Sequence, residues 1–352
     1  MKIIHTSDLH LDSALTTRLD SNKVRERKSE LILSFKRITE NARRDSVKAI
    51  IIAGDLFDTE KVGKRTQKNV IDIIRSCPET AFLYLSGNHE RTALLSSGIE
   101  LPENLKIFGE DWTYYRLGDV NFIGRSETSA DMFDTLRIDK SEKNIVVLHG
   151  ELRDRSAAGG VIGTKDVEDS GIDYLALGHY HSYSAVKIGN RCTAVYPGTP
   201  EGRGFDEAGD CGYVTINTDA GVSHVFTKSA KRALRIIEAD VTDTASDMAL
   251  IYKIEDSLKK IPSSDLVRIV LTGERALGRS LDTEALLSSL SNSFYYVEIR
   301  DETRLRISAD DFKNDVSLKG EFIRGVLSDD SLDEREKEAI INLGLGVLME
   351  EE

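Results

Sequence analysis

The sequence contains few of the residues that mark secreted, disulfide-linked or membrane proteins. It has three cysteines (Cys77, Cys192 and Cys211) and no C-x-x-C pair among 352 residues. An odd, scattered set of this kind predicts reduced thiols rather than a disulfide framework. No apolar run approaches the ~18 residues of a membrane span, and the N-terminus lacks the apolar core of a secretory signal. We therefore expect a cytoplasmic protein with no membrane segment.

Positive charge is also scarce, because 47 Lys and Arg face 60 Asp and Glu, for a net charge of −13. Duplex DNA recruits Lys and Arg to its phosphates, so this balance argues against a nucleic-acid partner. The acids are unevenly spread, however. Residues 329–352 hold nine acids and two bases, whereas residues 18–68 hold eight acids and fourteen bases. Basic clusters at 23–28, 43–44 and 61–68 could face DNA, although a solvated helix face is the default for each. The net charge alone therefore does not exclude DNA.

Hydrophobic residues make up 40% of the chain, which excludes disorder of the whole chain. Over the first two thirds, short β-branched or aromatic runs end at Gly, Asp or Asn, which is typical of buried strands. These runs lie at 3–4, 49–53, 81–85, 145–148, 174–177, 194–196 and 213–216. Between the first two, Leu31, Phe35, Ile38 and Ala42 recur at helical spacing and predict a helix that covers a sheet.

A second α/β pattern follows. It predicts strands at 234–239, 266–271 and 294–299, with helices at 248–261 and 283–290 and two short helices within 318–349. We therefore expect three parts: a larger α/β domain at 1–228, a small α/β domain at 229–312, and a helical segment with an acidic tail at 313–352.

Metal-binding side chains follow five of the predicted strands. The carboxyl ends of strands are where open α/β sheets bind their ligands. The residues at these ends are Asp8, His10, Asp55, Asp58, Asn88, His89, His149, His179 and His181. Imidazole and carboxylate together suit Mn, Fe or Zn better than Mg alone, and two such metals can clamp an in-line phosphoryl displacement. No Walker loop or nucleophilic serine elbow competes with this interpretation.

In this order the motifs resemble those of the calcineurin-like metallophosphoesterases. The matching segments are 8–10 (DLH), 54–58 (GDLFD), 87–90 (GNHE), 149–150 (HG) and 178–181 (GHYH). Segments 5–12 (HTSDLHLD) and 196–203 (YPGTPEGR) resemble the DNA-repair exonuclease branch of that family, the SbcD/YhaO-like nuclease subunits. The resemblance covers about residues 1–225. It implies a four-layer α/β/β/α sandwich with a smaller α/β capping domain and C-terminal helices.

The resemblance also implies a ligand set for two metal ions. The first would be held by Asp8, His10, Asp55 and His181. The second would be held by Asp55, Asn88, His149 and His179, so that Asp55 bridges the pair. The metal favoured by the resemblance is Mn²⁺, with Fe, Zn or Mg as alternatives.

Further residues are expected around these ligands. The resemblance implies that His89 stabilises or protonates the leaving oxygen. Asp58 stands where some relatives have a phosphate-contacting His; we group it with the catalytic candidates and expect it to orient His10. Arg203 is expected either to contact a substrate phosphate or to form a structural ion pair. Glu90 stands where Asp is common and receives no role, and Tyr180, between two ligands, is expected to pack in the core.

For function, the resemblance implies a metal-dependent DNA exonuclease that acts in DNA repair. It implies an SMC-like (SbcC-like) ABC ATPase partner that docks on the C-terminal helices, and a homodimer. Two alternatives stay open. The first is a phosphomonoesterase or cyclic-nucleotide phosphodiesterase, which the same ligands permit. The second is a mainly non-catalytic subunit that organises the ATPase.

Overall fold

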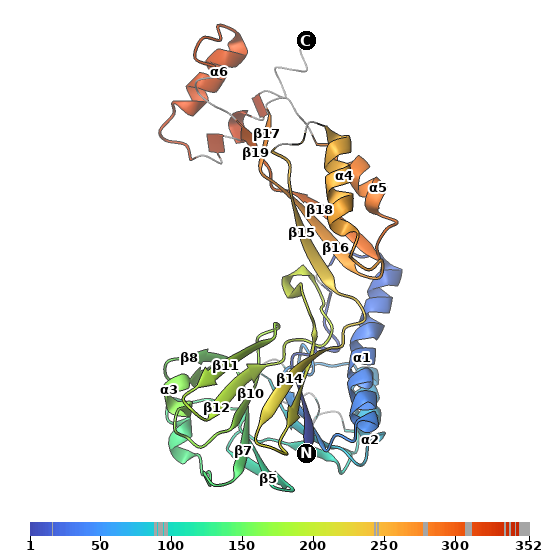
Figure 1. Cartoon of the computed structure of the whole chain (residues 1–352), viewed down its shortest axis with the longest axis vertical. Coiled ribbons are helices and arrows are strands. Elements are labelled where there is room, and N and C mark those ends of the chain that lie inside the picture. Colours follow the sequence, from blue (N-terminus) through green and yellow to red (C-terminus); the bar gives the residue numbers. More distant parts are fainter. Residues whose placement is uncertain are drawn as a thin grey trace. The chain divides into compact units, whose positions relative to one another are not determined.

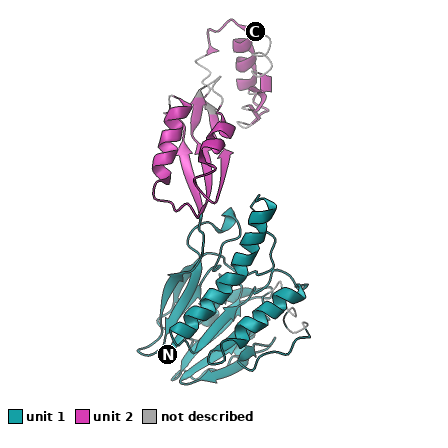
Figure 2. Ribbon diagram, turned by 90° about the vertical axis from the view of Figure 1, so that its right-hand side faces the viewer, with its two compact units in different colours: residues 1–234 teal, residues 235–352 magenta. Residues whose placement is uncertain are grey.

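The computed structural model describes residues 1–352 except 16, 88–89, 91–93, 95–97, 243, 245, 277–280, 307–311, 334–335, 338, 342 and 345–352, and it omits the side chains of 276 and 305. The chain divides into two compact units, Met1–Leu234 and Arg235–Glu352 (Figure 2). Across the described residues, no helix is both long and apolar enough to cross a bilayer. All three cysteines are buried free thiols, as predicted.

The first unit contains two mixed six-stranded sheets. The strands of the first sheet are β1 (Lys2–Thr6), β2 (Ala49–Ala53), β3 (Ala81–Leu85), β4 (Leu105–Ile107), β13 (Gly212–Asn217) and β14 (Ser223–Lys228). Their spatial order is β14-β13-β1-β2-β3-β4. Strands β1 to β4 are parallel, whereas β13 runs antiparallel to β1 and β14 antiparallel to β13. The carboxyl ends of β1, β2 and β3 therefore lie at one edge.

The second sheet also has six strands and is mixed. Its strands are β5 (Thr113–Leu117), β6 (Val120–Gly124), β7 (Lys143–His149), β10 (Tyr174–Gly178), β11 (Ser184–Ile188) and β12 (Cys192–Tyr196). They follow the order β11-β12-β10-β7-β6-β5, with a parallel centre and an antiparallel strand at each edge. A separate parallel pair joins β8 (Glu151–Arg153) to β9 (Val161–Gly163).

Two long helices cover the first sheet, α1 (Ser21–Arg44) and α2 (Lys64–Arg75), and both lie along one side of this unit (Figure 1). Asp20 caps α1 by accepting from the amides of Asn22 and Lys23. The predicted helical stripe is confirmed, since Leu31, Phe35 and Ile38 of α1 are buried in the same core cluster as Ile50. The outer face of the second sheet has shorter cover, from α3 (Thr164–Val167) and the 3-10 turn η2 (Met132–Thr135), while the 3-10 turn η3 (Phe205–Glu207) lies elsewhere in the unit.

Strand β2 shows why its sequence is apolar throughout. Alternate side chains of a strand point to opposite faces. Ile50 and Ile52 join the cluster under α1 and α2, while Ala49 and Ile51 join the cluster that contains Ile145 of the second sheet. Both faces of β2 are therefore buried, as in the parallel sheets of α/β proteins. This packing brings the carboxyl ends of the two sheets together.

The second unit is built on the three-stranded sheet β15-β16-β18. Its elements are β15 (Leu234–Asp240), α4 (Asp247–Leu258), β16 (Leu266–Thr272), β17 (Glu274–Ala276), α5 (Thr283–Leu290), β18 (Tyr296–Asp301), β19 (Arg304–Arg306) and α6 (Leu318–Leu327). Leu250 and Ile254 of α4 and Leu286 of α5 pack with Ile269 of β16. The strands predicted at 234–239, 266–271 and 294–299 correspond to β15, β16 and β18, and the helices predicted at 248–261 and 283–290 to α4 and α5. α6 is the first of the two short helices predicted within 318–349.

Candidate metal centre

The loops that follow the central strands have an uncommon backbone. Asp8 (φ 51°), His10 (φ 45°), Asp55 (φ 51°) and His179 (φ 107°) are four of the six described non-glycine residues with positive φ. Each such residue costs about 1–3 kcal/mol. The loops hold one another in place: the amide of Asp8 donates to Gly54 O (3.1 Å) and that of His10 to Asp55 O (3.0 Å). Strain that is maintained in this way is concentrated at functional sites.

Two buried carboxylates lie at the centre of these loops. Both oxygens of Asp8 accept from the backbone amide of His179, at 3.0 and 3.1 Å. Asp55 Oδ2 lies 3.7 Å from His10 Nε2 and 3.4 Å from His149 Nε2. One carboxylate oxygen thus faces imidazoles that come from both sheets, which is the position that a bridging ligand requires.

The donor atoms converge in two overlapping groups. One contains Asp8, His10 and His181, and the other contains Asp8, Asp55 and His149; within each group the donor atoms lie within 4.8 Å of one another. His149 Nε2 is buried without the geometry of a hydrogen bond to any described residue. Nitrogen and carboxylate oxygen at this spacing are donors that suit divalent transition metals. The residues present therefore fit a centre of two metal ions.

Most of the predicted ligands are brought together. Besides the two groups above, the ring of His179 lies 5.5 Å from that of His149, edge to face. Asn88 and His89 lie outside the described residues, so the ligand role of Asn88 and the leaving-group role of His89 stay predictions.

Two outer carboxylates contact the second nitrogen of two histidines. Asp58 Oδ1 lies 2.9 Å from His10 Nδ1, and Glu207 Oε1 lies 2.8 Å from His181 Nδ1. Burial raises the pKa of Glu207, but His181 and Arg203 outweigh burial and lower it to about 2, so this carboxylate is ionised. Glu207 was not among the predicted site residues, because its only signal in the sequence is the four-residue spacing from Arg203.

Arg203 lies between these outer carboxylates. Its Nε donates to Glu207 Oε1 (2.9 Å), and its Nη1 donates to Asp58 Oδ1 (3.2 Å) and to Ser13 Oγ (3.2 Å). The side chain is 12% exposed. Of the two expectations for Arg203, the observed contacts are those of an ion pair.

Glu90, to which the sequence analysis gave no role, is completely buried beneath the loop that carries Asp55. Its Oε1 accepts from the amide of Leu56 (2.8 Å) and its Oε2 from that of Phe57 (2.6 Å). Burial raises the pKa of Glu90 to about 8. One carboxylate therefore satisfies two consecutive amides immediately after the predicted bridging ligand.

Three glycines leave room for the ligands. A Cβ at Gly54 would lie 2.1 Å from His149 Nδ1, and one at Gly87 would lie 1.9 Å from Asp55 Oδ1. A Cβ at Gly178 would lie 1.9 Å from Ala53 O, the carbonyl to which His149 Nδ1 is hydrogen-bonded at 2.9 Å. Any side chain at these positions would therefore displace a predicted ligand or its support.

Burial also governs the ionisation of the ligands. It raises the pKa of Asp8 to about 6 and lowers that of His10 to about 4. Burial lowers the pKa of His149 too, but the interactions with Asp55 and Asp8 outweigh it and raise this pKa to about 9. A divalent ion reverses this balance, because it favours ionised carboxylates and unprotonated imidazole nitrogens.

A cavity of about 680 Å³ adjoins this centre at His149 and His179. Its described lining includes the carboxylates of Glu60, Glu110, Glu127 and Glu151, with no lysine or arginine among the described lining residues. The volume falls in the range of small-molecule sites.

Two expectations about single side chains were wrong. Tyr180 is 43% exposed rather than packed in the core, and its hydroxyl donates to Glu151 Oε2 (3.0 Å). Arg27, within a basic cluster that could have faced DNA, is buried and paired with Glu30 and Glu201.

Comparison with known proteins adds the family. Residues 1–183 match the model of the calcineurin-like phosphoesterase family. The chain is 28% identical to the uncharacterized metallophosphoesterase YhaO of Bacillus subtilis (strain 168) over 295 residues, which is 78% of this chain and 72% of YhaO. It is 23% identical to the DNA double-strand break repair protein Mre11 of Aeropyrum pernix, over 70% of this chain and 65% of that protein. A solved structure from Thermus thermophilus aligns with 64% of this chain and 98% of its own, at 13% identity and a TM-score of 0.42.

The family match extends over more than half of the chain and includes all five of the strand ends that carry the candidate ligands. The chain therefore belongs to the calcineurin-like phosphoesterase family and is a metallophosphoesterase.

Proposed function

We propose that the protein is a metal-dependent DNA nuclease that hydrolyses phosphodiesters at a centre of two divalent ions. The observation that carries the proposal is the convergence of Asp8, His10, Asp55, His149 and His181 at the meeting carboxyl ends of two sheets. The DNA part of the proposal is supported by the similarity to Mre11 proteins, which are named for DNA double-strand break repair.

In this proposal Asp8, His10, Asp55 and His181 hold the first ion, and Asp55, Asn88, His149 and His179 hold the second. When bound, two such ions supply an activated water and bind the phosphate oxygens of the substrate. Mn²⁺ is the proposed metal.

The protein's own side chains complete the chemistry. His149 Nδ1 is fixed by Ala53 O, so its Nε2 is the nitrogen free to coordinate. Asp58 contacts Nδ1 of His10 at 2.9 Å and is proposed to orient His10, as Ala53 O orients His149. His89 is proposed to donate a proton to the leaving oxygen.

A second candidate, a phosphatase or cyclic-nucleotide phosphodiesterase, is favoured by the cavity beside His149 and His179. Its four glutamates repel the successive phosphates of a polynucleotide, whereas its volume suits one small organic group. The third candidate, a non-catalytic partner of an SMC-like ATPase, has no such support, because an organising role does not require a convergent ligand set. Docking of that ATPase on the C-terminal helices and homodimer formation remain part of the proposal.

The deciding experiment compares substrates. Labelled duplex and single-stranded DNA with defined ends, an aryl phosphate and a cyclic nucleotide are each incubated with the protein and Mn²⁺ or Mg²⁺. We expect DNA cleavage that is lost in Asp55→Asn and retained in Asp134→Asn, a matched change at an exposed aspartate. Turnover of the small esters while the DNA stays uncleaved would refute the nuclease proposal and favour the second candidate.

A second variant tests the proton donor. His89→Ala is expected to remove most DNA turnover while the bound Mn²⁺, measured by elemental analysis, stays at the wild-type level. Full activity of this variant would contradict the leaving-group role of His89.

A further inference from the structure

A single guanidinium connects the two carboxylates that contact His10 and His181. Arg203 donates to Asp58 and to Glu207, and each of these carboxylates faces the Nδ1 of one histidine. The five side chains come from three strand-end loops and one turn, yet they form a continuous chain of contacts. In both histidines the other ring nitrogen, Nε2, faces a ligand carboxylate: Nε2 of His10 lies 3.7 Å from Asp55, and Nε2 of His181 lies 4.0 Å from Asp8.

The tautomer of each histidine follows from the charges. A carboxylate can only accept, so contact with one favours a proton on Nδ1, and a metal would then be bound through Nε2. Arg203 Nη2 also lies 3.3 Å from His181 Nδ1. That contact is not a hydrogen bond in this arrangement, because both atoms carry protons, and the shorter 2.8 Å approach to Glu207 determines the tautomer.

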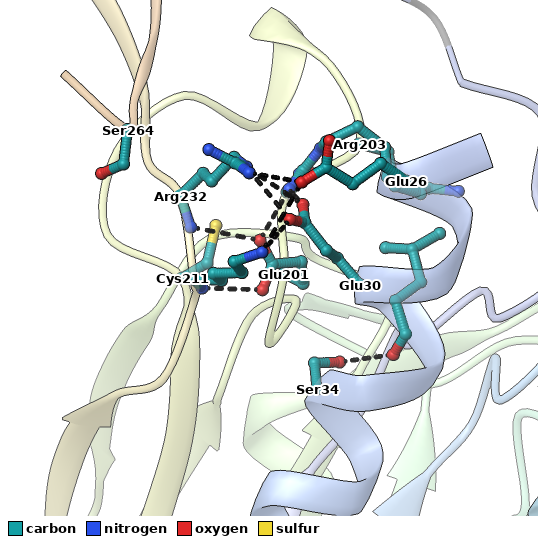
Figure 3. Close-up of polar contacts among 12 residues, drawn as sticks. Glu26, Glu30, Ser34, Glu201, Arg203, Cys211, Arg232 and Ser264 are labelled. Carbon is teal, nitrogen blue, oxygen red and sulfur yellow. Dashed lines mark hydrogen bonds and ion pairs between the residues drawn. The ribbon is translucent and has the colours of Figure 1, made fainter. Parts of the chain in front are cut away.

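The loop that carries Arg203 and Glu207 is itself anchored. Glu201, two residues before Arg203, is buried and accepts from Arg27 (3.0 Å) and Arg37 (2.8 Å) of α1. Arg232 binds Glu30 of α1 at 3.0 Å, and Figure 3 shows Glu30, Glu201 and Arg232 converging beside this helix. Because the loop is fixed at Glu201, Arg203 and Glu207 have a defined position relative to the strand ends.

The two proposed ions differ in what supports their histidine ligands. His10 and His181, proposed for the first ion, contact side-chain carboxylates, and both carboxylates bind Arg203. His149, proposed for the second ion, is instead hydrogen-bonded to a backbone carbonyl, Ala53 O, at 2.9 Å. Loss of Arg203 would therefore disturb the first pair of histidines and leave the support of His149 in place.

We propose that Arg203 is a positioning residue that acts through Asp58 and Glu207 to hold both histidine ligands of the first metal ion. This inference rests on the two-ion centre of the proposed function but not on its substrate. It assigns Glu207 to the same role as Asp58, and it replaces the phosphate contact as the role of Arg203. Carboxylates that support metal-bound histidines in this way typically contribute 10–100-fold to metal affinity.

The test measures metal binding directly. Wild type, Arg203→Gln, Glu207→Gln and Asp58→Asn are titrated with Mn²⁺ by isothermal calorimetry, and the bound ions are counted by elemental analysis. Arg191→Gln is the matched control, since Arg191 binds Asp173 with two nitrogens at 2.8 Å and touches no predicted ligand. We expect one of two ions to bind 10–100-fold more weakly in the three site variants and no change in the control.

Co²⁺ provides a second readout, because its visible spectrum reports the ligands of each ion. Arg203→Lys should recover only part of the affinity lost in Arg203→Gln, since an ammonium lacks the planar fork that reaches two carboxylates. Lower thermal stability with unchanged affinity for both ions, or equal weakening of both, would overturn the positioning role. Wild type that binds no metal would instead refute the two-ion centre, so the two failures are distinguishable.

Discussion

Shortening Glu90 by one methylene group should destabilise the first unit although it retains the carboxyl group. Glu90 lies at 2.8 Å from the amide of Leu56 and 2.6 Å from that of Phe57. In Glu90→Asp the carboxylate retreats by about one bond length, ~1.5 Å, which stretches both contacts to roughly 4 Å, beyond hydrogen-bonding range. No water can readily replace it, because Glu90 is completely buried. Two consecutive amides would then lose their acceptor.

The magnitude follows from these two bonds. A hydrogen bond to an uncharged group contributes about 0.5–1.5 kcal/mol, and a buried donor without a partner costs about 1–3 kcal/mol. Partial relaxation of the loop recovers some of this, so we expect the free energy of unfolding to fall by about 3 kcal/mol. That loss is a large fraction of the roughly 5–15 kcal/mol that is typical of a folded domain.

The assay uses urea denaturation followed by the fluorescence of Trp112. This is the single tryptophan of the chain and lies in the first unit, so the signal reports on that unit alone. Glu79→Asp is the control, because Glu79 is exposed and the substitution is the same. If Glu90→Asp unfolded within about 0.5 kcal/mol of this control, Glu90 would not support the loop as described.

Three further changes test the centre and the core. Gly87→Ala should weaken Mn²⁺ binding at least tenfold, because its Cβ would lie 1.9 Å from Asp55 Oδ1, whereas Gly63→Ala meets nothing within 4 Å and should bind normally. Burial lowers the pKa of His5 from the ordinary 6.5 to about 3. Between pH 6.5 and 3 the unfolded chain therefore binds more protons at His5 than the folded protein does, and the free energy of unfolding falls as pH drops through that window. The slope, up to about 1.4 kcal/mol per pH unit, should flatten in His5→Phe, as measured by urea denaturation at each pH. Removal of metal by a chelator should lower the melting temperature. At Mn²⁺ concentrations 100 times the Kd, the bound ion adds about 2.7 kcal/mol to the free energy of unfolding, and this stability should be recovered when Mn²⁺ is added back. An unchanged melting temperature would contradict a metal centre.

The sequence was sufficient to locate the strands of the first unit that its apolar runs predict, and the candidate ligands near their ends, but not the unit's other strands, such as β5, β6 and β11. A run such as 49–53 is apolar at every position because both of its faces are buried, and that pattern is visible without a structure. Asp8 and Asp55 could be predicted as candidate donors because each lies two residues beyond a strand, and His149 because it ends one. Pairing of β1 with β2 brings Asp8 and Asp55 together, and the packing of the two sheets brings His149 to them.

The supporting residues could not be found in the same way. Glu90 and Glu207 act on groups that are distant in the sequence: Glu90 on amides 33 and 34 residues away, and Glu207 on His181. Nothing in their immediate sequence distinguishes them from solvated acids. Tyr180 was misassigned for a related reason, because alternation along a strand does not apply to the loop that follows β10, where the backbone of His179 has positive φ. Residues whose role depends on contacts between elements require the structure.

Ion pairs within the protein also reduce the number of arginines that can bind a substrate phosphate. Arg27 and Arg37 are paired with Glu201, and Arg203 with Glu207 and Asp58, so three arginines of this unit already neutralise acids of the protein. The cavity beside the centre adds four glutamates to its described lining. Attraction for a phosphate therefore has to come largely from the metal ions, which would contribute about four positive charges at the buried carboxylates. With the proposed two-ion centre, metal occupancy would determine the binding of a phosphoester as well as its hydrolysis, so a chain with a net charge of −13 would still be able to act on an anionic substrate.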